Sequence, residues 1–237
     1  MKIGFFIEGQ TERIFLIKFL EEYLGGEQNF SRTEFKSLGK EAVKLIGERK
    51  YPAAEIYILI FDCGGDGSVF SVLNDRADKL ITKNNYDYLV VLRDLYNFKR
   101  NEKRLVVNKF RDLFSNYSYQ SKIRLVLSIM EIESWFLADY SLFAKINSIL
   151  TPDYIQKKLG YDLINTDPEI YNHPASIINK IYGLVGSKYK KRKDQSYQIS
   201  TRIDFDILLC LVDDKKRLKS FKYFIDVIDS CIEIFKH

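Results

Sequence analysis

Residues 2–25 read KIGFFIEGQTERIFLIKFLEEYLG, an apolar run that ends at Glu8 and leads into a helical pattern. A short run that is apolar at nearly every position is typical of a strand buried on both faces. The apolar residues that follow recur at helical spacing as far as Gly25 and Gly26, which predict the end of a helix. A buried strand that leads directly into an amphipathic helix is the building unit of parallel α/β sheets.

The same pairing of strand and helix recurs through the first two-thirds of the chain. Further buried-strand patterns lie at residues 55–62, 86–94 and 122–133, and helical patterns lie at residues 69–83, 101–117 and 134–146. Residues 33–37 are predicted to form a short edge strand and residues 40–49 a helix. We therefore predict an α/β fold in which a mostly parallel sheet is flanked by helices.

The character of the sequence changes after residue 146. Three of the four prolines and many polar residues follow, together with two helical patterns near the end of the chain. This composition is typical of loops and short helices rather than of further strands. We predict an α/β domain over residues 1–146 and a mainly helical C-terminal extension over residues 147–237.

The composition argues against several classes of protein. The three cysteines are widely spaced and form no C-x-x-C pair, so neither a disulfide framework nor a zinc site is predicted. The two histidines, His173 and His237, are too few for zinc hydrolase motifs and for most histidine-based catalytic sites. No apolar run approaches the roughly 18 residues that suggest a membrane span. We expect a cytoplasmic protein that makes no use of a membrane.

Every buried-strand pattern ends in a carboxylate. These acids are Glu8, Asp62, Asp94, and Glu131 with Glu133. The carboxyl ends of parallel strands share one edge of a sheet, where open α/β folds bind ligands. Carboxylates gathered there repel one another unless a cation or protons neutralise them. Sites made only of oxygen ligands suit Mg²⁺ or Mn²⁺, so we predict that these five acids are the candidate metal ligands.

Each acid also has a simpler explanation. Glu12 lies in the first turn of its helix, where the helix dipole alone accounts for it, and Asp62 precedes a glycine-rich turn. A structural role is therefore favoured for Glu12, Asp62 and Glu131 taken singly. Metal binding is favoured for Glu8, which precedes Gly9, and for Asp94.

A dense basic run near the middle of the extension is the candidate nucleic-acid contact. It consists of Lys188, Lys190, Lys191, Arg192 and Lys193, with Tyr189 among them. Such a run can bind phosphates while the aromatic ring stacks on a base, and it can equally be a solvated loop. The net charge of +5 permits a polyanionic partner without requiring one.

Three stretches, FFIEGQTERIFL, VVLRDLYNF and IMEIESWFLAD, together resemble a TOPRIM-like family of bacterial proteins. That group is related to the TOPRIM domains of topoisomerases, primases and overcoming-lysogenization-defect nucleases. With the downstream SKYKKRKD and LKSFKYFIDVI, the resemblance covers nearly the whole chain. It implies that Glu8 is a metal ligand or general acid/base and that Asp94 is the first aspartate of the metal motif. Tyr96 stands where nuclease members have the second aspartate.

The resemblance implies a magnesium-dependent nuclease of DNA or RNA, with Glu8, Asp94 and Glu133 as the catalytic residues. Relatives often accompany an ATPase in phage-defence loci, so an ATPase partner is implied as well. The alternative is a catalytically weak or inactive subunit that binds and regulates such an ATPase, which Tyr96 favours. A third hypothesis is a small-molecule phosphotransfer enzyme that uses the glycine-rich turn at residues 63–68.

Overall fold

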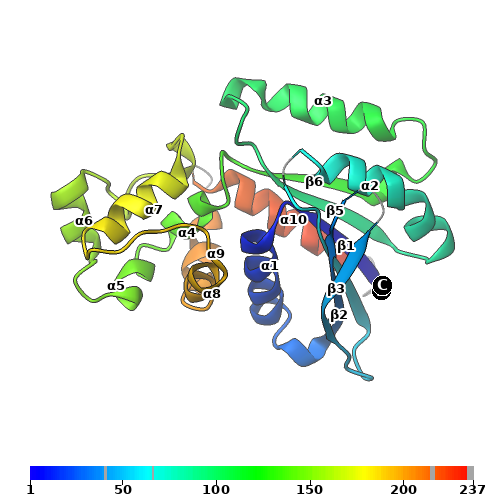
Figure 1. The fold of residues 1–237 in the computed structure, drawn as a ribbon, viewed down its shortest axis with the longest axis horizontal. Coiled ribbons are helices and arrows are strands. Elements are labelled where there is room, and N and C mark those ends of the chain that lie inside the picture. Colours follow the sequence, from blue (N-terminus) through cyan, green and yellow to red (C-terminus); the bar gives the residue numbers. More distant parts are fainter. Residues whose placement is uncertain (40–41, 66, 214–216, 234–237) are drawn as a thin grey trace.

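A six-stranded, mostly parallel sheet forms the centre of the molecule (Figure 1). The computed structural model describes residues 1–39, 42–65, 67–213 and 217–233. The strands are β1 (Lys2–Ile7), β2 (Phe30–Ser37), β3 (Val43–Arg49), β4 (Ile56–Asp62), β5 (Tyr88–Asp94) and β6 (Ile123–Ser128). They lie in the order β3-β2-β4-β1-β5-β6, and every neighbouring pair is parallel except β2 with β3. The predicted α/β fold is confirmed.

Helices cover both faces of this sheet and gather beyond one end of it (Figure 1). On one face lie α2 (Val69–Asp78, continued by a π-helical turn, Lys79–Lys83) and α3 (Lys103–Phe114). On the other lie α1 (Gln10–Tyr23) and α10 (Lys219–Glu233). The remaining helices are α4 (Glu133–Ala138), α5 (Leu142–Ile146), α6 (Pro152–Leu159), α7 (Pro174–Gly183), α8 (Lys193–Ser200) and α9 (Phe205–Asp213). Short 3₁₀ turns lie at Glu27–Asn29, Arg100–Glu102, Gln120–Lys122 and Pro168–Ile170.

The two faces of the sheet belong to two separate apolar clusters. Adjacent residues of β1 point to opposite sides, so Phe5 lies in the cluster with α1 and α10, and Phe6 in the cluster with α2 and α3. Both rings are fully buried. Burial on two faces is the reason why the strands are apolar at nearly every position. The larger cluster joins residues from both sides of residue 146, such as Trp135 and Phe224, and the proposed division into two domains stays a prediction.

Several predicted elements differ from the structure. The predicted helix at 134–146 is interrupted after Ala138 and forms α4 and α5, and the predicted strand at 122–133 ends at Ser128. The predicted helix at 40–49 is in fact strand β3, over the part of it that the structure describes. Strand β3 pairs antiparallel with β2 and is mostly exposed, which leaves the predicted strand at 33–37 inside the sheet as part of β2. An exposed edge strand has little apolar alternation, so tertiary pairing overrode a local pattern that resembled a helix.

No helix in the described ranges combines the length and apolar character needed to cross a bilayer.

Candidate active site

Glu8 and Asp94 lie next to each other at the carboxyl edge of the sheet. Their strands, β1 and β5, are neighbours with Ile7 opposite Leu92. The backbone N–H of Asp94 donates a hydrogen bond of 3.0 Å to Oε1 of Glu8. Residues that are separated by most of a domain in the sequence therefore meet, as the parallel sheet predicted.

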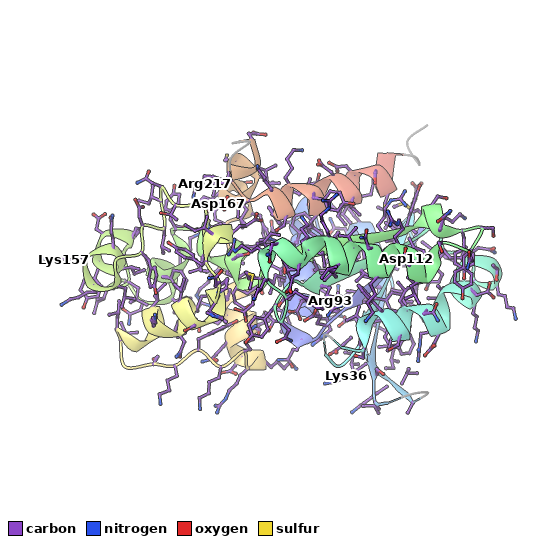
Figure 2. The ribbon with its side chains drawn as sticks, turned by 90° about the horizontal axis from the view of Figure 1, so that it is seen from above. Lys36, Arg93, Asp112, Lys157, Asp167 and Arg217 are labelled. Atoms are coloured by element: carbon purple, nitrogen blue, oxygen red, sulfur yellow. The ribbon has the colours of Figure 1, made fainter. Side chains whose placement is uncertain are left out.

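The Asp94 carboxylate is held in one orientation by β6 and the segment that follows it. Its Oδ1 accepts hydrogen bonds from the hydroxyl of Ser128 and from the backbone N–H of Ile132, the latter at 2.9 Å. Behind it, the Arg93 guanidinium lies 4.8 Å from the ring centre of Phe70, and its Nε is 3.5 Å from Oε1 of Glu8. Figure 2 shows Arg93 near the middle of the molecule, under α3. Arg93 thus supplies positive charge to Glu8 from inside the fold.

Glu131 and Glu133 converge on a single ammonium group. Nζ of Lys191 lies 3.1 Å from Oε1 of Glu131 and 3.0 Å from Oε2 of Glu133. The hydroxyl of Tyr189 donates to Oε1 of Glu133 at 2.9 Å, and the N–H of Ala175, in the first turn of α7, donates to Oε2 of Glu131 at 3.0 Å. The charged hydrogen bonds tie the segment after β6 to the loop before α8.

This meeting point uses unusual backbone conformations. Met130, just before Glu131, has φ +66°, and Lys191 has φ +52°. Left-handed conformations are unfavourable for residues with a side chain and persist where surrounding contacts enforce them. The turn at Met130 ends the strand before Glu131, so the two glutamates reach Lys191 from a loop and a helix start rather than from one extended strand.

Glu12 is a site residue that the sequence reasoning assigned to the helix dipole alone. It lies in the first turn of α1 and is only 6% exposed. Burial, with a contribution from the charge of Glu133, raises the pKa of Glu12 to about 7. Burial and the charges of Glu12, Glu8 and Glu133 raise the pKa of Asp94 well above its usual value. The only sequence signal for this role was its position within the EGQTE motif.

The cluster contains more negative than positive charge. Its acids are Glu8, Glu12, Asp94, Glu131 and Glu133, and the cations that face them in the described residues are Lys191 and Arg93. Burial raises the pKa of Glu133, although Lys191 opposes that shift. Burial works against a charged Lys191, but Glu133, Asp94 and Glu131 outweigh it and raise its pKa. The excess acid charge favours uptake of protons or of a further cation.

Residues 7–210 match the family described as "Domain of unknown function (DUF4276)". The match takes in Glu8, Asp94, Glu133 and Lys191, and covers well over half of the chain. The chain belongs to the DUF4276 family. Comparisons with the curated proteins and with the solved structures give no match.

The oxygen donors of this DUF4276 site suit a hard divalent cation in chemistry. Glu8 and Asp94 are the residues that would hold it first, and the roles of Glu131 and Glu133 as metal ligands, which Lys191 engages, stay predictions. Among the residues that the structure describes, no three acidic, histidine or cysteine side chains are arranged as a ready metal cage.

Asp62 lies at the same sheet edge but is engaged in a turn. It is 3% exposed, and its Oδ1 accepts a hydrogen bond of 3.0 Å from the N–H of Gly64. Its charge acts on Cys63, where burial first and Asp62 second raise the pKa of the thiol. The turn contact agrees with the structural alternative for Asp62, and its role as a metal ligand stays a prediction.

The basic run of the DUF4276 protein divides into two parts. Four of its side chains, Lys188, Lys190, Arg192 and Lys193, are exposed beside the cluster. Lys191 instead turns toward the acids, with 38% of its side chain still exposed. Tyr189 is buried, with its ring centre 5.8 Å from that of Tyr182, so it is not available to stack on a base. Contacts of the exposed members with nucleic acid stay a prediction.

An open groove of about 810 Å³ adjoins the acids and includes Tyr96, Met130 and His173. The Tyr96 ring is 41% exposed and packs edge-on against His173, with centroids 6.2 Å apart. None of the five cluster acids lines this groove, and Met130 is its link to them because it directly precedes Glu131.

The titration of Glu12 predicts that the protein becomes more stable as the pH falls. The folded-state pKa of Glu12 is about 7 against a usual 4.5, so the folded protein binds more protons than the unfolded chain in this interval. Its unfavourable contribution is complete above pH 7 and disappears toward pH 4.5, with an upper limit of about 3 kcal/mol.

Urea unfolding between about pH 5 and pH 8 measures this effect. Glu12→Gln should flatten the pH dependence of the free energy of unfolding. Glu22→Gln, an exposed position on the same helix, should retain it. Identical pH profiles for the wild type and Glu12→Gln would contradict the assignment.

Proposed function

We propose that this DUF4276 protein is a TOPRIM-like phosphodiesterase that hydrolyses DNA or RNA with the help of Mg²⁺ or Mn²⁺. The observation that carries the proposal is the convergence of Glu8, Glu12 and Asp94 at one sheet edge, where burial raises the pKa of two of them. Perturbed pKa values in a cluster of acids are typical of catalytic sites. The resemblance to TOPRIM-like nucleases, which includes Glu8 and Asp94, supports the same activity.

Each residue has a distinct part in the proposed reaction. Glu8 and Asp94 would hold the cation, which when bound supplies charge for the phosphate oxygens and lowers the pKa of water. Glu12, with a pKa of about 7, can accept or donate a proton near neutral pH. Lys191 can place its ammonium against the negative charge of the phosphate while Glu133, one of the predicted catalytic residues, orients it.

The surroundings of the cluster support a nucleic-acid substrate. The exposed side chains Lys188, Lys190, Arg192 and Lys193 adjoin Lys191 and can neutralise backbone phosphates. The half-exposed Tyr96 at the neighbouring groove can stack against a base or a sugar. We propose that a strand of DNA or RNA crosses the acid cluster between the exposed basic side chains and Tyr96.

The cellular setting follows from the resemblance alone. We propose that the protein acts in the cytoplasm as an effector of phage defence and that an ATPase is its partner.

A second function, that of an inactive subunit that binds an ATPase, has its own support. Lys191 already pairs with both Glu131 and Glu133. By the resemblance, Tyr96 occupies the place of an acidic ligand. A site held together by its own ammonium group can persist for structural reasons after catalysis is lost.

Glu8→Gln is expected to reduce cleavage by about a thousandfold or more, because it removes a charge that would face the cation. The measurement is cleavage of single- and double-stranded DNA and RNA with Mg²⁺ or Mn²⁺, with and without the ATPase partner. Glu22→Gln is the matched control and should leave the rate unchanged.

Two outcomes decide between the candidate functions. Cleavage that survives both Glu8→Gln and Asp94→Asn would remove the nuclease assignment. A wild-type protein that cleaves none of the substrates yet binds the ATPase would support the second function.

A further inference from the structure

Strand β6 is the outermost strand on one side of the sheet. It pairs with β5 on its inner side, from Leu89 opposite Ile123 to Asp94 opposite Ser128. On its outer side no strand of the described chain pairs with it. The outward N–H and C=O groups of an edge strand are a template for an added strand, unless something covers them.

A groove of about 420 Å³ runs along this outer edge, between α3 and α10. Its floor contains Ile123, Leu125 and Leu127, which are the residues of β6 that face α3. Val107 of α3 and Tyr223 of α10 line its walls and are 40% and 49% exposed. Figure 2 shows the two helices running alongside each other, with Asp112 marking α3. The groove thus presents apolar side chains next to a strand edge that no strand in the described part of the chain occupies.

All the charged side chains that line this groove in the described chain are positive. Four cations line it: Lys103 and Arg111 from α3, Arg124 from β6, and Lys219 from α10. None of the described residues that line it is acidic. At the rim, Asp112 lies 3.7 Å from Arg111 but both are largely exposed, so this pair compensates little of the charge. The complementary ligand is therefore acidic and partly apolar.

We propose that the β6 groove binds an extended acidic segment of a partner protein, which adds a strand to the outer edge of β6. The backbone of the segment would pair with β6, its apolar side chains would contact Leu125 and Tyr223, and its carboxylates would face the four cations. The inference concerns the outer edge of β6, whose groove is lined by none of the five cluster acids, and does not depend on the proposed hydrolysis.

A second copy of this chain does not suit the groove. Pairing of two β6 edges would bring two sets of the same four cations together, and like charges oppose such an interface. A nucleic acid would satisfy the cations but would leave the apolar floor and the strand edge without partners. These two ligands are therefore competing outcomes of the test below.

The test uses a fluorescein-labelled peptide of about eight residues in which glutamate and valine alternate, matching the length of a strand. We expect saturable binding by fluorescence anisotropy. Lys103→Glu combined with Lys219→Glu should weaken binding by about tenfold or more, because it reverses two charges of the groove. Arg104→Glu combined with Lys109→Glu is the matched control, since both residues are exposed on α3 outside the groove and should leave binding nearly unchanged.

Two further measurements separate strand addition from simple charge attraction. The same peptide with alternate N-methylated amides lacks the donors for pairing and should bind much more weakly. Hydrogen exchange of the unmodified protein should show new protection at Ile123–Ser128 when the peptide is added. This second readout does not depend on the folding of any variant.

Several results would overturn the proposal. If the N-methylated peptide bound as tightly as the unmodified peptide, strand pairing would contribute nothing to binding. If both double variants lost the same affinity for the peptide, charge alone would hold it. Displacement of the peptide by single-stranded DNA at the groove would assign it to nucleic acid, and concentration-dependent dimerisation that the peptide blocks would assign it to a second copy. Glu8→Gln should bind the peptide normally, which keeps this result distinct from that of the cleavage assay.

Discussion

Asp94→Asn is expected to abolish cleavage while leaving the protein at least as stable as the wild type at about pH 8. The carboxylate is buried, and the charges of Glu12, Glu8 and Glu133 raise its pKa, so its ionised form is unfavourable in the folded protein. An asparagine side chain can still accept the hydrogen bonds from Ser128 and Ile132. Its amide can in addition donate to the neighbouring acids.

The expected loss of cleavage is about a thousandfold or more, since the variant removes a proposed ligand charge. The expected gain in the free energy of unfolding is about 1–2 kcal/mol, which is typical of removing an unfavourable group from an active site. Asp153→Asn, at an exposed position of α6, is the control and should change neither quantity. A clear loss of stability in Asp94→Asn would instead assign the carboxylate a structural role.

Lys191→Met is expected to destabilise the protein at neutral and mildly alkaline pH. It leaves Glu131 and Glu133 without their ammonium partner, and the side chain of Glu133 is fully buried. Breaking a buried pair costs about 3–5 kcal/mol, and the 38% exposure of the Lys191 side chain reduces the expectation to about 2 kcal/mol. The measurement is urea unfolding at about pH 8.

The stability loss in Lys191→Met should depend on pH. The pKa of Lys191 is raised above its usual 10.5, so the ammonium is charged in the folded protein throughout the neutral range. Without it, Glu133 takes up a proton more readily, and the folded variant gains stability as the pH falls. We expect the difference from the wild type to be largest near pH 8 and to shrink toward about pH 5.

Two variants make the Lys191 test specific. Lys190→Met removes a charge from the exposed neighbouring residue and should cost less than about 0.5 kcal/mol. Adding Glu133→Gln to Lys191→Met should recover much of the lost stability, because the buried charge is then gone. If Lys190→Met and Lys191→Met were equally stable, the ion pairs of Lys191 would contribute nothing to the free energy of unfolding.

The sheet and the pairing of Glu8 with Asp94 were predictable from local patterns. Apolar runs flanked by helical periodicity specify buried parallel strands, and parallel strands place their carboxyl ends at one edge. The rule places Glu8 and Asp94 at the same edge, and the structure adds that β1 and β5 are neighbours, which lets the Asp94 N–H reach Glu8. Strand β3 was not predictable in this way, because an exposed edge strand depends on its partner β2 rather than on its own pattern.

The inward position of Lys191 and the burial of Glu12 had no comparable local signal. In the sequence, Lys191 is one of several basic residues, and Glu12 is one of many acids in the first turn of a helix. Their roles arise where α1, the segment after β6 and the loop before α8 pack together, since packing removes water and lets nearby charges act strongly on one another. Local patterns thus specify the buried strands and which strand ends share an edge. The protonation of the acids and the choice of their cation depend on how those elements pack.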